Sequence, residues 1–534
     1  MDKPHKTHSK TIKTLKNNAA KGNLLSMFQL YENYKSGKNV EAVDDELAQT
    51  YLDVISEKLP NAKLKLKSVD LYNFRRLMSF DLTFNDKLTI IIGNNGSGKT
   101  AIVESLAKTF TWFNKALEKS TNGRPVTESD VNVNAKDYGE IVTDIEIGEA
   151  TLFETVLSKV APESNHSKSS EVSDIKLAGS LYRYLASNDQ VNLPLLAYYS
   201  VERSDFTLQQ TYSESARGDV STNRFDSLDD ALDGTGKLDK FSQLYIELVN
   251  LADGEVASEV KALRQQITNI ESILAEAYEG EIPSKSDPVV KKLELKKKEL
   301  KAALDNNCSV KHQNQLALVN KAIETIVPDV TDLEVDRSSG KVKLMVKNFG
   351  NRVNISQLSQ GQKTLVALIG DIARRLVVLN PNSENALASH GIVIIDEVEL
   401  HLHPKWQQEV LVGLQKVFSN IQFIVTTHSP QVLSHIDPKH TTVIKLSSEN
   451  NQIKKVIVRD TYGRNADLIY EGNMGVTSRP EEIQSKIEEI FKLIEQKDLS
   501  KAKSEITSLS EKIGDDGQLV KAMTLIKRME LIGK

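Results

Sequence analysis

The stretch LTIIIGNNGSGKTAIVESLAKTF, residues 88–110, decides the fold class of this chain. It passes from a short apolar run through a glycine-rich loop into a helical pattern, which predicts a buried strand, a tight loop and a helix. The loop matches G-x-x-x-x-G-K-[ST], in which backbone N–H groups and the next helix N-terminus bind phosphates. We therefore expect an α/β fold with a nucleotide-binding loop formed by Gly93, Asn94, Asn95, Gly96, Ser97, Gly98, Lys99 and Thr100.

Two adjacent acids follow a second apolar run, GIVII at residues 391–395. In a nucleotide site built on Lys99, Asp396 and the Thr100 hydroxyl are expected to hold Mg²⁺. Glu397 is expected to orient the water that attacks the γ-phosphate. Paired acids are common in loops, so this interpretation depends on the phosphate-binding loop in the same chain.

Two further motifs lie around these acids. LSQGQ, residues 358–362, precedes a long helical pattern, and TTHSP, residues 426–430, follows the apolar run IQFIV. Ser359 is a good helix N-cap, so a purely structural role is one interpretation of the first motif. Resemblance of these motifs to those of ABC ATPases implies a functional role instead, in which Ser359, Gly361 and Gln362 contribute to a phosphate site and His428 contacts the γ-phosphate.

The order of the four motifs resembles that of ABC ATPases of the RecF/SMC/Rad50-like branch, over residues 64 to about 470. The family signature is usually LSGGQ, and Gln360 replaces its first glycine here. The resemblance implies ATP and Mg²⁺ as ligands, and a dimer or higher oligomer joined through ATP. In that family the signature of one subunit completes the phosphate site of the other, and His428 matches the switch histidine. No Q-loop glutamine can be identified.

DEVELHLHPKWQ together with TTHSP resembles the ATPases of anti-phage defence systems, including OLD proteins and PtuA of Septu. OLD proteins continue into a Toprim nuclease, which needs a glutamate and then an Asp-x-Asp pair, but no such pair follows Glu471. Resemblance to PtuA implies a separate HNH nuclease, PtuB. The retron form of PtuA, which the length and N-terminus favour, implies a reverse transcriptase and its reverse-transcribed DNA or RNA.

These resemblances predict an ATPase subunit that controls a partner nuclease. One alternative is a RecF- or Rad50-like repair ATPase that clamps duplex DNA, and a less favoured one is an OLD-like nuclease. Bulk charge does not favour nucleic acid, because 68 Lys and Arg oppose 73 Asp and Glu to give a net charge of -5. Any basic surface must therefore be local.

Composition indicates a folded protein outside the membrane. Hydrophobic residues make up 39% and charged residues 26%, an ordinary globular balance. No run approaches the about 18 apolar residues of a membrane span, and the N-terminus has no signal-peptide core. The single cysteine, Cys308, excludes an intramolecular disulfide and a multi-cysteine zinc site. We expect a cytoplasmic protein.

The chain divides into five expected parts. They are a basic tail with a Sel1/TPR-like helical hairpin (1–60), an N-lobe of the ATPase head (61–250), a helical hairpin insertion (251–327), a C-lobe (328–470) and a helical region (471–534). Within the N-lobe, residues 140–205 are expected to form strands, interrupted by an exposed polar loop at 161–174.

Two of these parts leave alternatives open. The insertion has apolar residues spaced by three and four, which fits either a coiled-coil arm or a packed helical lid. That seam consists of Val256, Val260, Leu263, Ile267, Ile270 and Leu274, and then Val290, Leu293, Leu300 and Leu304. The basic tail either contacts phosphates of a nucleic acid or, more commonly, is a solvated tail. Its lysines are Lys3, Lys6, Lys10, Lys13, Lys16 and Lys21.

His401 and His403 have the spacing of a zinc-binding pair. No third ligand is near them in the sequence, and a zinc site needs at least three protein ligands. Their segment resembles the D-loop region of the family, which implies a position at the dimer interface.

Overall fold

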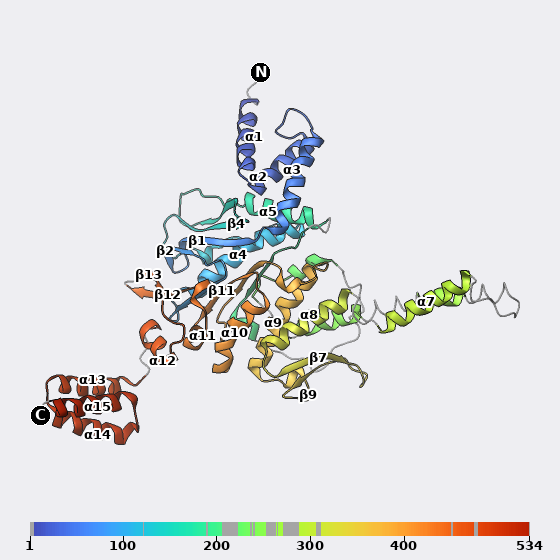
Figure 1. Cartoon of the computed structure of the whole chain (residues 1–534). Coiled ribbons are helices and arrows are strands. Elements are labelled where there is room, and N and C mark those ends of the chain that lie inside the picture. The colour runs from blue at the N-terminus through green and yellow to red at the C-terminus, as the bar shows by residue number, and fades with distance from the viewer. Residues whose placement is uncertain are drawn as a thin grey trace. The chain divides into compact units, whose positions relative to one another are not determined.

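The computed structural model describes residues 5–120, 122–187, 191–204, 223–234, 238, 241–252, 263, 265–270, 288–305, 311–449, 452–474 and 479–532. It contains two compact units, which meet in the chain between Gly463 and Arg464. Figure 1 shows their helices and strands. The first unit carries all four motifs.

A six-stranded sheet forms the centre of the first unit, in the order β13-β12-β3-β11-β10-β6. All neighbours are parallel except β13, which is antiparallel to β12. Every residue of the four strands β3, β11, β10 and β6 is buried, as expected for a parallel sheet covered on both faces. The strands are β3 (Leu88–Gly93), β6 (Leu195–Tyr199), β10 (Gly391–Ile395), β11 (Ile421–Thr427), β12 (Thr441–Glu449) and β13 (Gln452–Val458). The predicted α/β class is confirmed.

The strand order brings the motifs together. β11, which precedes His428, lies between β3, which precedes the phosphate-binding loop, and β10, which precedes Asp396. Since the strands are parallel, their carboxyl ends share one edge of the sheet, where ligands of open α/β sheets bind. Helix α4 (Lys99–Glu118) leaves this edge and packs against the sheet, together with α9 (Gln360–Leu379).

A four-stranded antiparallel sheet, β2-β1-β4-β5, lies beside the N-terminal part of α4. Its strands are β1 (Leu64–Phe74), β2 (Leu77–Thr83), β4 (Tyr138–Ile147) and β5 (Thr151–Val160). Buried and partly exposed residues alternate along β4, as expected for a sheet with one face on the core. The expectation of strands throughout 140–205 is wrong at one place: Ser173–Ala186 forms helix α5. Its apolar residues follow a helical period, and they pack against α4.

The N-terminal hairpin is packed on the head. It consists of α2 (Leu24–Ser36), which ends at Gly37 with φ 72°, and α3 (Asp45–Lys58). The Tyr31 hydroxyl lies 2.5 Å from that of Tyr184 on α5, and Leu24 N–H donates to Thr151 Oγ1 at 2.8 Å. The preceding basic segment is helical from its first described residue, as α1 (His5–Ala20).

Only part of the expected 251–327 insertion is described. Val256, Val260 and Leu274 of the proposed seam lie outside the described residues, and α7 (Pro288–Asp305) contains the second half. α8 (Lys311–Ile326) packs against α9, and the Gln315 side chain donates to the Val377 carbonyl at 2.9 Å. The coiled-coil arm stays a prediction.

The C-lobe also contains a small antiparallel sheet, β7-β8-β9. Its strands are β7 (Val330–Asp336), β8 (Lys343–Asn348) and β9 (Asn351–Asn354). The predicted hairpin at 338–340 joins β7 to β8. α10 (Pro404–Val417) and the short α11 (Pro430–Ser434) complete the described helices of this lobe.

The second unit is helical, as predicted for the C-terminal region. After the short α12 (Ala466–Ile469), it consists of α13 (Glu481–Glu495), α14 (Leu499–Ile513) and α15 (Gly517–Ile532). Ile487, Ile490, Ile506 and Ile526 belong to a core of its own. Within the described ranges, none of the helices combines the length and the apolar character that crossing a bilayer requires.

The buried His390, directly before β10, makes a pH-dependent contribution to stability. Burial lowers its pKa from 6.5 to about 4, with a further contribution from Lys63. The unfolded chain therefore binds a proton between these pH values that the folded chain does not. The contribution of His390 to the free energy of unfolding is fully present above pH 6.5. It falls by about 3 kcal/mol as the pH drops to the pKa of the folded protein.

We expect His390→Gln to remove this pH dependence, because glutamine does not titrate. Urea unfolding of both proteins at several pH values between 4 and 6.5 measures it. Parallel loss of stability in both proteins across this range would contradict the assignment to His390.

Candidate ATP site

The phosphate-binding loop connects β3 to α4. Gly96 and Gly98 have φ values of 76° and 94°, which glycine adopts without the steric cost of a Cβ atom. A Cβ on Gly98 would also lie 3.1 Å from Leu77 Cδ2. Lys99 Nζ donates to the Gly93 carbonyl at 2.9 Å and so closes the loop from inside.

The loop presents exposed backbone above a buried cation. Asn94, Asn95 and Gly96 are exposed, whereas Lys99 is buried. Burial lowers the pKa of Lys99, and the carboxylates of Asp396 and Glu397 oppose that effect. A desolvated ammonium group beside exposed loop backbone is suited to an anionic ligand such as a phosphate chain.

Asp396, at the end of β10, is fixed by hydroxyl groups on both carboxylate oxygens. Thr100 Oγ1 donates to Oδ2 at 3.0 Å, and Thr426 Oγ1 donates to Oδ1. Asp396 is only 1% exposed, whereas Thr100 is exposed at the mouth of the loop. Hydroxyl and carboxylate oxygens in this arrangement are the hard donors that Mg²⁺ prefers. The residues therefore fit the predicted metal position.

Glu397 and His428 face each other beside this pair. His428 Nε2 lies 4.0 Å from Glu397 Oε1, and both side chains are about one third exposed, at 32% and 35%. Burial lowers the pKa of His428, and the nearby Lys99 lowers it further. The imidazole is therefore neutral at pH 7, so that it can both donate and accept hydrogen bonds. Glu399 accepts a hydrogen bond from the His428 backbone N–H and holds this loop.

The signature segment forms the N-terminus of α9. Ser359 is its N-cap and makes a capping box with Gln362, whose N–H donates to Ser359 Oγ at 3.3 Å. The Gln362 side chain also donates to Asn348 Oδ1 at 2.8 Å. A Cβ on Gly361 would lie 2.7 Å from the His401 carbonyl. The capping role is thus present, and it leaves the positive end of a long helix at this place.

Comparison with known proteins agrees with this geometry. Residues 64–433 match the family model of the AAA ATPase domain. The retron Vc95 probable ATPase of Vibrio cholerae serotype O1 biovar El Tor is 33% identical over 512 residues, which cover 92% of this chain and 96% of the relative. The chain belongs to the retron ATPase family.

Two more relatives extend the comparison. The retron Ec83 probable ATPase of Escherichia coli is 30% identical to this chain, over 86% of this chain and 85% of the relative. The Septu protein PtuA of Bacillus thuringiensis is 23% identical, over 69% of this chain and 73% of the relative. The protein is therefore an ATP hydrolase of the ABC type that belongs to the ATPases of anti-phage defence systems.

Two arginines near the ATP site of this retron ATPase family member belong to none of the sequence motifs. Arg76, between β1 and β2, donates to the carbonyl of Gly96 at 2.8 Å. Arg203 follows β6 and donates to the backbone carbonyls of Asp396 and Glu397. Their signal in the sequence is position alone: Arg203 follows an apolar run, LPLLAYY, whose carboxyl end meets the other motifs. The proximity of the end of β6 to the end of β10 follows only from the order of strands in the sheet.

The two D-loop histidines have other roles than a zinc pair in the described structure. His403 is the N-cap of α10, and its Nδ1 accepts from the Lys405 N–H at 3.4 Å. The backbone of His401 has φ 63° and packs on the signature glycine. Within the described ranges no three His, Cys, Asp or Glu residues form a group that could hold a metal ion.

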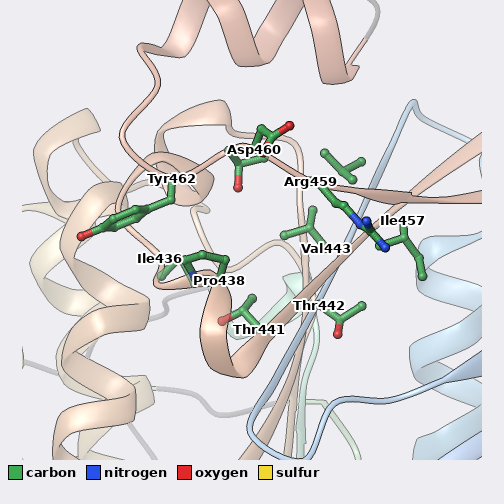
Figure 2. A pocket seen from close by; sticks show the side chains of 11 residues that line it. Ile436, Pro438, Thr441, Thr442, Val443, Ile457, Arg459, Asp460 and Tyr462 are labelled. Carbon is green, nitrogen blue, oxygen red and sulfur yellow. The ribbon is translucent and has the colours of Figure 1, made fainter.

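A pocket of about 550 Å³ lies elsewhere on the ATPase and is shown in Figure 2. Thr441, Thr442 and Val443 begin β12, which runs parallel to β3, so this pocket lies at the opposite edge of the sheet from the phosphate-binding loop. It is also lined by Ile436, Pro438, Ile457, Val458, Arg459, Asp460, Thr461 and Tyr462. None of the motif residues lines it.

Proposed function

We propose that this protein hydrolyses ATP in a site shared by two copies of the chain, and that hydrolysis controls a partner nuclease in anti-phage defence. The observation that carries the proposal is the 3.0 Å hydrogen bond from Thr100 to Asp396. It joins the phosphate-binding loop to the acidic strand end, so that one chain brings together the groups proposed to bind phosphate and those proposed to bind the metal.

Each residue has a separate role in this proposal. The loop amides and Lys99 bind the β- and γ-phosphates, and Thr100 and Asp396 hold Mg²⁺, which would neutralise phosphate charge. Glu397 orients the attacking water, and His428, 4.0 Å away, contacts the γ-phosphate. Both side chains are about one third exposed and therefore accessible to a bound nucleotide, while Asp396 is buried.

The second half of the site comes from another copy. Ser359 and Gly361 stand at the N-terminus of α9, where the positive end of the helix dipole favours an anion. The family resemblance supports a contact between this segment and the γ-phosphate bound by the partner. ATP therefore joins two heads into a dimer or higher oligomer, and each site needs both chains.

Mixing two inactive variants tests the shared site. Lys99→Ala removes the phosphate-binding lysine and Ser359→Arg blocks the signature, so each protein alone is expected to be inactive. Equal amounts of both give about half heterodimers, each with one intact site, so we expect roughly a quarter of the wild-type ATPase rate. A mixture as inactive as its components, with heterodimers verified by differential tags, would contradict a shared site.

The partner nuclease is inferred from the relatives. No Asp-x-Asp pair of the Toprim kind follows Glu471 in the sequence. Two relatives are named retron probable ATPases, and another is the Septu protein PtuA. We propose an HNH nuclease of the PtuB kind as the partner, with a reverse transcriptase and its reverse-transcribed DNA or RNA in the same complex.

Co-purification with the products of neighbouring genes tests this partnership. We expect a stable complex whose nuclease is released or activated when the nucleotide state changes. The absence of any nuclease from the complex would count against the proposal. Strong stimulation of the isolated ATPase by duplex DNA alone, falling steeply with salt, would favour the DNA-clamp alternative instead.

A further inference from the structure

Arg203 is one of the most deeply buried charged residues of the head. It lies in a 3₁₀ turn, Val201–Ser204, directly after β6, and is 1% exposed. Its Nη1 donates to the Asp396 carbonyl at 2.5 Å and to the Ser200 carbonyl at 2.8 Å, and its Nη2 donates to the Glu397 carbonyl at 2.6 Å. One guanidinium group thus holds two successive peptide carbonyls next to the ATP site.

These two peptides set the direction of the Glu397 side chain. Glu397 has φ 48°, in the left-handed region that is unfavourable for a residue with a Cβ atom. Its N–H donates to Thr426 Oγ1 at 2.8 Å, and its carbonyl is held by Arg203. The unfavourable conformation is therefore fixed from both sides, and it turns the carboxylate toward His428.

The arginine is charged and firmly anchored. Burial lowers its pKa to about 10, against the effect of Asp396 and other nearby carboxylates, so it remains protonated at neutral pH. β6 is fixed to the same strand end, because Asp396 N–H donates to the Tyr199 carbonyl at 2.8 Å. The Tyr199 hydroxyl in turn donates to the buried Asp371 of α9 at 2.9 Å.

Asp371 is itself held by two arginines of α9. Arg375 Nε lies 2.7 Å and Arg374 Nη2 lies 3.3 Å from its carboxylate. Burial would raise the pKa of Asp371, but the two guanidinium groups lower it to about 2. The anchor of β6 on α9 is thus an ionised carboxylate at all physiological pH values.

We propose that Arg203 is a positioning residue for hydrolysis, which holds the Asp396–Glu397 backbone so that the Glu397 carboxylate faces the γ-phosphate and its attacking water. This inference rests on the proposed role of Glu397. Arg203 is buried, at 1% exposure, and does not itself reach the exposed part of the site. It acts through the peptide carbonyls, for which a planar guanidinium with paired donors is suited and a lysine ammonium is not.

Substitution of Arg203 by lysine tests the role while keeping the charge. We expect kcat to fall about 10²-fold, since misplacement of a reacting group by about 1 Å has this effect. The affinity for ATP should change by less than about threefold, because the phosphate-binding groups are intact. Steady-state ATPase assays and binding of a fluorescent ATP analogue measure the two quantities separately. An unchanged kcat, or a parallel loss of affinity, would overturn the proposal.

Arg224→Lys is the matched control for a purely structural effect. Arg224 also donates to backbone carbonyls, with Nε 2.7 Å from Leu379 O and Nη1 3.3 Å from Ala186 O, but it lies outside the ATP site. We expect this variant to lower the melting temperature as much as Arg203→Lys does, with kcat close to the wild-type value. A similar loss of kcat in both variants would assign the effect to stability.

The double variant Arg203→Lys/Glu397→Gln separates this inference from the proposed function. If Arg203 acts through Glu397, the double variant hydrolyses ATP no more slowly than Glu397→Gln alone. A double variant whose kcat is lowered by the product of the two single-variant reductions would overturn the positioning role. A Glu397→Gln single variant with wild-type kcat would instead remove the role proposed for Glu397, on which this inference rests.

Discussion

Glu397→Gln is expected to slow ATP hydrolysis about 10²- to 10³-fold, the loss that follows removal of one well-placed catalytic group. Glutamine keeps the size of the side chain, but it is a far weaker acceptor for a proton of the attacking water. The backbone that holds residue 397 is unaffected, because Thr426 and Arg203 bind its peptide groups. ATP binding should therefore be retained.

Single-turnover hydrolysis and equilibrium nucleotide binding measure the two effects. Because ATP joins the heads in the proposed dimer, the variant should also accumulate as a dimer with ATP, which light scattering detects. Glu409→Gln, at an exposed position of α10, is the control and should behave as the wild type. Equal losses in binding and in hydrolysis would show that Glu397 acts on the nucleotide rather than on the water.

Lys99→Ala should weaken ATP binding itself. The ammonium group is buried, and burial lowers its pKa against the effect of Asp396 and Glu397, so its removal would leave a bound phosphate chain without this buried cation. Removal of one partner from a buried charge pair typically costs 2–5 kcal/mol, which is roughly 30- to 4000-fold in affinity. Hydrolysis at subsaturating ATP should fall at least as far.

Isothermal titration with ATP measures the loss. Lys115→Ala is the control, because this lysine lies on the same helix, α4, but pairs with Glu118 at 2.7 Å. Its nucleotide affinity should be unchanged. Retention of wild-type affinity by Lys99→Ala would contradict the placement of phosphates on this loop.

The sequence alone was sufficient for the fold class and for the motifs. The phosphate-binding loop can be recognised from the sequence because its glycines, lysine and threonine lie close together in the chain. The same holds for the acidic pair after β10 and for the capping serine of α9. Their assembly follows from a simple rule, that carboxyl ends of parallel strands share an edge, and the hydrogen bond from Thr100 to Asp396 agrees with it.

Other features depended on contacts between segments far apart in the chain. Helix α5 was missed because a polar stretch conceals its start, and it is stabilised by packing on α4. The packing of α8 on α9 likewise depends on contacts between separate segments, and no residue of the heptad-like seam belongs to α8.

Arg203 is the clearest example of a residue whose role depends on tertiary structure and not on a sequence motif. No spacing relates it to Asp396, from which it is 193 positions distant, and as a single arginine after an apolar run it carries no local signal. The sequence determined which strands form and which groups stand at their ends. Only the tertiary structure, by placing β6 next to β10, decided that this guanidinium reaches the peptides of Asp396 and Glu397. Hydrogen bonds of this kind depend on distances in space, whereas motifs depend on neighbours in the chain.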